Sequence, residues 1–295
     1  MSQELTMPLA DMSAKDMAAF LGQAEVATTG FPRFAINRDA EDDDENTLPV
    51  GTYVVWSPEH EINVYSKTAT IRPMMQRFHY AIYDSDENKW SNQSIKIRDL
   101  FSDEAIDEKG GVKCGKVSKR DLKNLSQADQ DYQKKIRCYR TIYGLASMEG
   151  VSAKGDDITL TEISCIWKTS GSNFMPLAEV FDQVIKQKKL MFNFAINLAK
   201  PRKEKNGANV YYVAVPTIDL STEIPFTDGN METLKTFNDI VSAENVEIES
   251  KWRNANKQHI IVGDNQAESF DNSGALDVDF KVMPPEEDLN DEIGL

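Results

Sequence analysis

The chain has 295 residues, of which 40% are hydrophobic and 27% are charged, and its formal net charge is −15. This length can bury a substantial core, and the composition is that of a globular protein rather than a disordered or fibrous one. No apolar run approaches the roughly 18 residues of a membrane span, and the first residues lack the basic and apolar regions of a secretory signal, so we expect a cytoplasmic protein without membrane association.

The negative charge is concentrated at the two ends of the sequence. Residues 1–50 contain ten acidic and three basic side chains, residues 264–295 contain ten and one, and residues 51–263 contain 28 and 29. Blocks of like charge are commonly disordered interaction tails. The sequence therefore predicts an N-terminal helix (13–25) and acidic arm over 1–50, a folded domain over 51–263, and a disordered acidic tail over 264–295.

The middle of the chain alternates between strand-like and helix-like sequence. Residues 51–97 are rich in Val, Ile, Thr and Tyr with period-two alternation, and residues 85–89 have the composition of a hairpin tip. Residues 101–137 predict a polar, basic insertion with a helix near 126–137 that Ser126 caps. The rest predicts two strands (138–148 and 157–170), a helix (174–189), two more strands (190–200 and 209–220) joined by a turn (201–207), and a short helix (231–243).

Motifs for catalysis are weak. Gly110, Gly115 and Lys116 fit the G-x₄-G-K spacing, but Val117 stands where a phosphate loop needs Ser or Thr. The three cysteines are far apart and form no zinc pattern with the three histidines. The 48 acidic side chains leave a two-metal nuclease site open. We expect a protein that is not an enzyme and that carries no cofactor or metal.

Basic and aromatic residues occur together in several segments. Single-stranded nucleic acid is held by a basic groove along its phosphates and by aromatic faces on which bases stack. In the first segment Phe78 and Tyr80 share one strand face and His79 and Ala81 the other, with Tyr83 and Trp90 nearby. The candidate nucleic-acid-binding residues are Arg72, Arg77, Tyr80, Lys113, Lys116, Lys119, Arg120, Lys134, Lys135, Arg137, Trp167, Lys168, Lys188, Lys189, Phe192, Phe194, Lys200, Arg202, Lys203, Lys205 and Tyr211.

The alternative for these segments is structural. Phe192 and Phe194 share one face of a strand, and that face could be the inner one, with the lysines only solubilising a hairpin.

The acidic tail has an apolar tip. A polyanion tethered to a basic groove can occupy it when nucleic acid is absent, because tethering raises its effective concentration, and once displaced it can bind a partner protein. Solubility alone is the competing explanation for an acidic terminus. The candidate partner-binding residues are Glu286, Glu287, Asp288, Asp291, Glu292, Ile293 and Leu295.

In layout the chain resembles the single-stranded DNA-binding proteins of bacteriophages. The resemblance rests on the terminal "PPEEDLNDEIGL", on the basic hairpin 200–209, and on the strand–strand–helix–strand–strand order over 138–220. It implies a mainly β fold with α insertions (α+β), with an OB-like five-stranded barrel core elaborated by extra strands and short helices. The zinc module of the best-known phage example has no counterpart here, and the insertion 101–137 has none that we can name.

The function expected from these features is binding of single-stranded DNA with little sequence specificity, during replication, recombination or repair, by a monomer or small homo-oligomer. Replication or recombination proteins would be recruited through the tail. Two alternatives stay open: a strand-annealing recombination protein, which would form large rings, and a virion or host-interaction protein whose acidic ends engage a basic partner.

Overall fold

The computed structural model describes residues 30–42, 45–84 and 89–263. The predicted helix at 13–25, most of the hairpin tip at 85–89 and the acidic tail lie outside these residues. The strands are β1 (Ala35–Ile36), β2 (Tyr53–Ser57), β3 (Ile62–Ser66), β4 (Ala69–Asp84), β5 (Lys89–Gln93), β6 (Ile136–Val151), β7 (Asp157–Thr169), β8 (Ile196–Asn206) and β9 (Asn209–Ile218). The helices are α2 (Lys119–Leu122), α3 (Gln127–Lys135), α4 (Phe174–Lys186) and α5 (Asp228–Gly263), with short 3₁₀ turns η2 (Lys113–Gly115), η3 (Gly171–Asn173) and η4 (Met191–Asn193).

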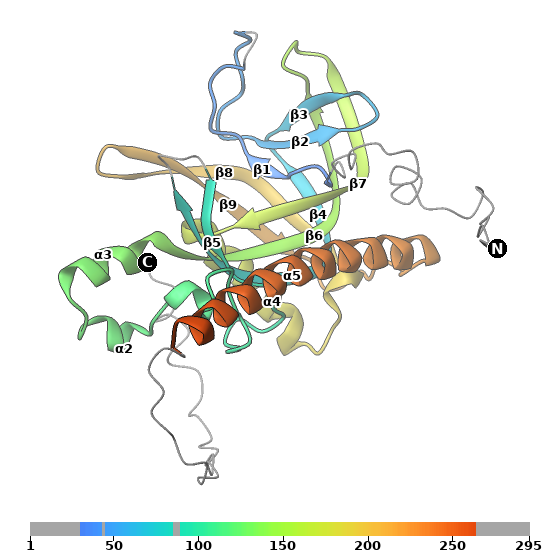
Figure 1. Cartoon of the computed structure of the whole chain (residues 1–295). Helices are drawn as coiled ribbons and strands as arrows, with labels where there is room; N and C mark the ends of the chain where they lie inside the picture. Colours follow the sequence, from blue (N-terminus) through green and yellow to red (C-terminus); the bar gives the residue numbers. More distant parts are fainter. Residues whose placement is uncertain (1–29, 43–44, 85–88, 264–295) are drawn as a thin grey trace, which may run out of the picture.

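The fold is mainly β, built on one antiparallel sheet with a few helices (Figure 1). The strand order is β1-β2-β3-β6-β4-β8-β9, with β5 added to β4 and β7 added to β6. No pairing among the described strands joins β1 to β9, so the sheet is open and the predicted closed barrel is not observed. The described residues between 30 and 50 belong to this unit, because β1 pairs with β2 and the buried Phe34 stacks on Tyr53.

The two central strands, β4 and β6, are 16 residues long each, and their pairing register shifts between Pro73 and Met75. An extra residue in one strand reverses which later side chains face each side of the sheet. Before the shift Ile71 lies in the main core, and after it Phe78 and Tyr80 continue on that side. Alternation along β4 therefore changes phase at Met74.

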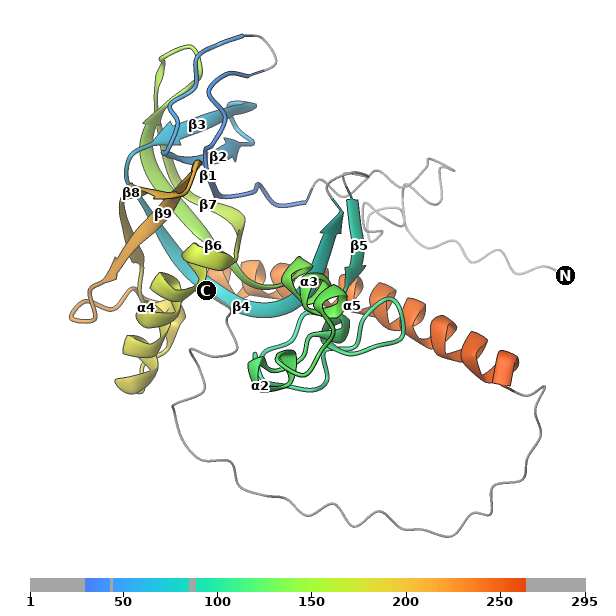
Figure 2. The same ribbon diagram turned by 90° about the vertical axis from the view of Figure 1, so that its left-hand side faces the viewer.

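Each side of the central sheet packs against a different helix, and Figure 2 shows α4 and α5 on opposite sides of β4. Leu177, Val180 and Phe181 of α4 join the main core. This amphipathic helix was predicted, although it ends at Lys186 rather than 189. Phe237 and Val241 of α5 join a separate cluster on the opposite side of the sheet. We call that side, which bears Tyr143 of β6, the α5 face.

Two helix predictions had different outcomes. The helix behind Ser126 is confirmed, since the Ser126 hydroxyl oxygen accepts from the backbone N–H of Asp129 at 3.2 Å. The short helix predicted at 231–243 is wrong in length, because α5 runs 36 residues to Gly263. Pairs one turn apart, such as Lys251 with Glu247, support its second half. Within the described ranges, α5 and the other helices are all too short or too polar to cross a bilayer.

Gly144 of β6 lies so close to β4 that only glycine fits. A Cβ at this position would stand 2.6 Å from the backbone oxygen of Arg72. We predict that Gly144→Ala lowers the free energy of unfolding by about 2 kcal/mol or more, because backbone atoms cannot yield locally. Urea unfolding followed by circular dichroism measures this change.

Gly229, in the first turn of α5, is the matched control. A Cβ there meets nothing nearer than 3.9 Å, and alanine favours helix over glycine. Gly229→Ala should leave stability unchanged or raise it. Wild-type stability in Gly144→Ala would contradict the close packing of β4 on β6.

Candidate nucleic-acid interface

Four of the predicted binding residues are in the interior. Tyr80, Trp167 and Phe194 are buried to 6%, 3% and 1% exposure, and Arg72 to 5%. Tyr80 packs beneath the segment 95–114, and Trp167 stacks edge-on against Phe34. As they stand, these side chains cannot contact a nucleic acid, so the structural alternative holds for them.

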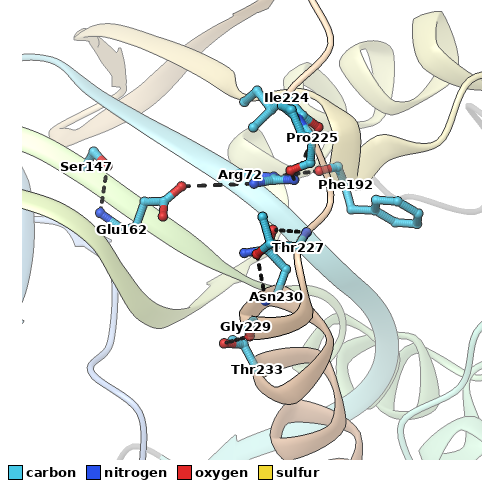
Figure 3. A network of polar contacts seen from close by, with 10 residues as sticks. All are labelled: Arg72, Ser147, Glu162, Phe192, Ile224, Pro225, Thr227, Gly229, Asn230 and Thr233. Atoms are coloured by element: carbon cyan, nitrogen blue, oxygen red, sulfur yellow. Dashed lines mark hydrogen bonds and ion pairs between the residues drawn. The ribbon is translucent and has the colours of Figure 1, made fainter.

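Arg72 links β4 to the chain entering α5 (Figure 3). Its guanidinium donates from Nε to the carbonyl oxygen of Phe192 at 2.6 Å and from Nη2 to that of Pro225 at 2.9 Å. A longer contact of 4.0 Å reaches the carboxylate of Glu162. Burial lowers the pKa of Arg72 and the carboxylate opposes this shift. The residue therefore has a structural role rather than a phosphate-binding one.

Several basic residues of the insertion also have local partners. Lys116 donates to the carbonyl oxygens of Gln133 and Ile136 at the end of α3, which is the helix end that a cation stabilises. Lys113 pairs with Asp103 and Lys134 with Asp131. Within the predicted set, the exposed cations of the insertion with no ion pair among the described residues are Arg120, Lys135 and Arg137; of Lys119 only the backbone, in α2, is described.

Several predicted binding residues in and near the basic hairpin also have local partners. Arg202 and Tyr211 both bind the carboxylate of Glu204. Lys189 donates to the carbonyl oxygen of Leu220 at 2.7 Å, and Phe192 packs against Phe226. The side chains left exposed without an ion pair in the described structure are Lys188, Lys200, Lys203 and Lys205.

The predicted basic segments do not form one groove. Figures 1 and 2 show the β8–β9 hairpin and the α2–α3 insertion as separate projections of the molecule. Neither projection carries a row of exposed aromatic rings from the predicted set. The expectation of one groove through both segments is therefore not supported.

The α5 face carries an aromatic row that the predicted set largely missed. Tyr83 contacts Trp90 with ring centroids 5.1 Å apart, Trp90 contacts Tyr139 at 5.5 Å, and Tyr139 stacks on His79 at 5.1 Å. Burial increases along this row, from Tyr83 at 44% exposure to His79 at 2%. We call these four residues the aromatic row; it joins β4, β5 and β6.

Cations surround the aromatic row. Arg137 lies opposite Ala81, and Lys168 lies opposite Thr141, so both share the α5 face. The positive charges of Arg137 and Arg33 lower the pKa of Tyr139, although burial raises it more. Arg77 and Lys168 of the predicted set therefore lie on the same face as the missed aromatics.

The sequence contains the signal for this face. Alternation in β4 separates Phe78 and Tyr80 from His79 and Ala81, and the structure confirms that separation. The predicted set contains the buried Tyr80 and Trp167. It leaves out Tyr83 and Trp90, which are the more accessible rings. Only the tertiary packing shows which of the two faces is covered.

In the described ranges no group of three or more His, Cys, Asp or Glu side chains has metal-binding geometry. Burial raises the pKa values of all three cysteine thiols, which disfavours the thiolate form that binds metals or attacks substrates. The tail residues Glu286 to Leu295 lie outside the described residues. No family model, curated protein or solved structure matches the chain.

His79 should make stability depend on pH. Burial, with Lys168 and Lys96 nearby, lowers its pKa well below 6.5. Below pH 6.5 the unfolded chain binds a proton that the folded chain does not, so stability falls as pH decreases. Between pH 6.5 and 5 we expect a contribution of up to about 1.4 kcal/mol per pH unit.

Thermal unfolding of His79→Leu across this range should show a correspondingly shallower slope. His60, which is exposed in the turn between β2 and β3, provides the control variant His60→Leu. Equal slopes in the wild type and in His79→Leu would show that the imidazole is protonated in the folded state.

Proposed function

We propose that this protein binds single-stranded DNA with little sequence specificity and without catalysis. The bases would stack on the outer end of the aromatic row and the phosphates would contact the cations beside it. This assigns the interface to the α5 face rather than to the two basic projections.

The aromatic row is the observation that carries the proposal. Tyr83 is 44% exposed, and Trp90 and Tyr139 are partly exposed. Rings of this kind stack with any base, because every base has a π-face, and each stack contributes about 1–3 kcal/mol. A run of mutually contacting rings along a sheet therefore suits an unpaired strand of mixed sequence.

The charge of this region supports the same ligand. Arg137 is exposed at the start of β6, and Arg33 is exposed; the charges of both act on Tyr139. The segment 51–263 is nearly neutral overall, so a local group of unpaired cations determines where a polyanion is attracted.

The strand–strand–helix–strand–strand order of β6, β7, α4, β8 and β9 is the order that the phage-protein resemblance implies, and we propose that this part derives from an OB-like arrangement opened at its edges. The acidic tail would compete with DNA and recruit replication or recombination proteins. The location would be the cytoplasm, which is the host cytoplasm if the protein is viral.

Replacing Trp90 tests the stacking role. Trp90→Ala should weaken binding of fluorescein-labelled oligo-dT at low salt by about 5-fold to 150-fold, which corresponds to 1–3 kcal/mol. The control is Trp56→Ala, since Trp56 is 43% exposed on β2, away from the row. Anisotropy titrations measure both, and circular dichroism confirms folding. Equal affinities for the two variants would remove the aromatic row from the interface.

The salt dependence distinguishes the two possible surfaces. The double variant Arg33→Ala/Arg137→Ala should reduce the slope of log K against log salt by about 1.4, since each phosphate contact of a single strand contributes about 0.7. The hairpin variant Arg202→Ala/Lys203→Ala should change it less, because Arg202 already pairs with Glu204. The reverse order would place DNA on the hairpin.

A further inference from the structure

A cleft of about 170 Å³ lies between the α5 face of the sheet and α5. The inner end of the aromatic row, His79, lines it together with Lys96, Lys168 and Glu244. At about 30 Å³ for each water molecule, this space can hold a tetrahedral oxyanion with some of its hydration.

Cations are crowded at this cleft. Arg33 lies near enough to Lys168 to lower its pKa, and Lys168 does the same to Lys96, whose pKa falls to about 7 through burial first and this charge second. Arg77 on the same face is similarly affected by burial and by Arg98. Like charges brought together away from water repel one another. This repulsion raises the free energy of the folded protein when no anion is bound in the cleft.

The three carboxylates that line the cleft pair with Lys96 and Lys251 and leave Lys168 without one. Lys96 pairs with Glu244 of α5, and Asn245 fixes the Lys96 backbone through two hydrogen bonds. Glu108 and Glu247 also line the cleft, but both bind Lys251. Arg33, Arg77 and Lys168 have no ion pair among the described residues.

Polar groups around the cations also lack partners. Neither ring nitrogen of His79 has a hydrogen-bond partner, although the residue is 2% exposed. The hydroxyls of Thr141 and Tyr143 are buried without partners as well. Thr141 lies between Arg77 and Lys168 in the pairing register. Buried polar groups are rarely unsatisfied, and here a ring N–H, two hydroxyls and several cations share one region of the sheet.

We propose that this cleft binds a phosphate-class oxyanion, with Lys168 and Lys96 supplying the charge and His79 a neutral N–H donor. The anion supplies the negative charge that Lys168 and its neighbours lack and accepts from the imidazole. Its source is either free phosphate or a phosphate of the bound strand, and only the second depends on the function proposed above.

Thermal unfolding of the full chain in inorganic phosphate tests the site. With chloride adjusted to keep ionic strength constant, the wild-type midpoint should rise saturably. At about ten times Kd the rise should be roughly 3–6 °C. Lys168→Gln should lose this rise and should itself be more stable than the wild type without phosphate, because it removes an unpaired cation.

Two control variants isolate the site. Lys168→Arg keeps the charge and should keep the response. Lys203→Gln removes an exposed lysine of the β8–β9 hairpin that does not line the cleft, and it should keep the response too. Phosphate also stabilises proteins generally by exclusion from their surface, so an equal rise in wild type and Lys168→Gln, or no rise in the wild type, overturns the proposal.

Oligo-dT separates the two sources of the anion. If the strand places a phosphate in the cleft, inorganic phosphate should compete with oligo-dT beyond the effect of ionic strength, and Lys168→Gln should abolish that competition. If phosphate binds but oligo-dT does not bind at low salt, the oxyanion site stands as a free-phosphate site and the proposed DNA-binding function fails.

Discussion

The position of α5 depends on the buried guanidinium of Arg72. This group joins the first part of β4 to carbonyl oxygens of Phe192 and Pro225, and so fixes the chain just before α5 begins. Thr227 and Asn230 then exchange hydrogen bonds at the first turn (Figure 3). A buried charge without its partners is strongly unfavourable, so these carbonyls and Arg72 constrain each other. The α5 face, the cleft and the open end of the aromatic row all follow from where α5 is directed.

The register shift at Met74 is the second feature that determines which side chains lie on the α5 face. It places Ile71 and Phe78 on one side of the sheet although they are seven residues apart. Arg72 and Arg77 therefore share the α5 face, while Tyr80 does not. A strict alternation over the whole strand would divide these residues differently. Pro73 stands beside the shift and is paired with Gly144 of β6, and proline or glycine within a strand often marks a bulge.

Local structure was largely predictable from the sequence, and the site only partly. The Ser126 cap and the amphipathic α4 depend on nearby residues, and they form as expected. The strands form with some different bounds, because η4 occupies part of the strand predicted at 190–200 and β8 continues through most of the turn predicted at 201–207. The roles of the basic residues depend on distant contacts. Lys189 binds the carbonyl oxygen of Leu220, and Lys116 binds the end of α3, and neither contact has a sequence pattern. The sequence alone therefore led us to expect that these lysines would be free to bind phosphate.

The aromatic row and the cleft are one continuous arrangement, because His79 belongs to both. Rings lie at the open end, where bases can reach them, and unpaired cations lie at the closed end, where a phosphate would be least screened by water. A single strand has these two chemistries in alternation along its length. In the function proposed above, the bases of a bound strand would contact the outer rings, and one backbone phosphate would reach the cations under α5. Glu244 of α5 already pairs with Lys96 and so neutralises part of the positive charge at the cleft. In this proposal α5 would therefore form one wall of the cleft and also compete weakly with its ligand.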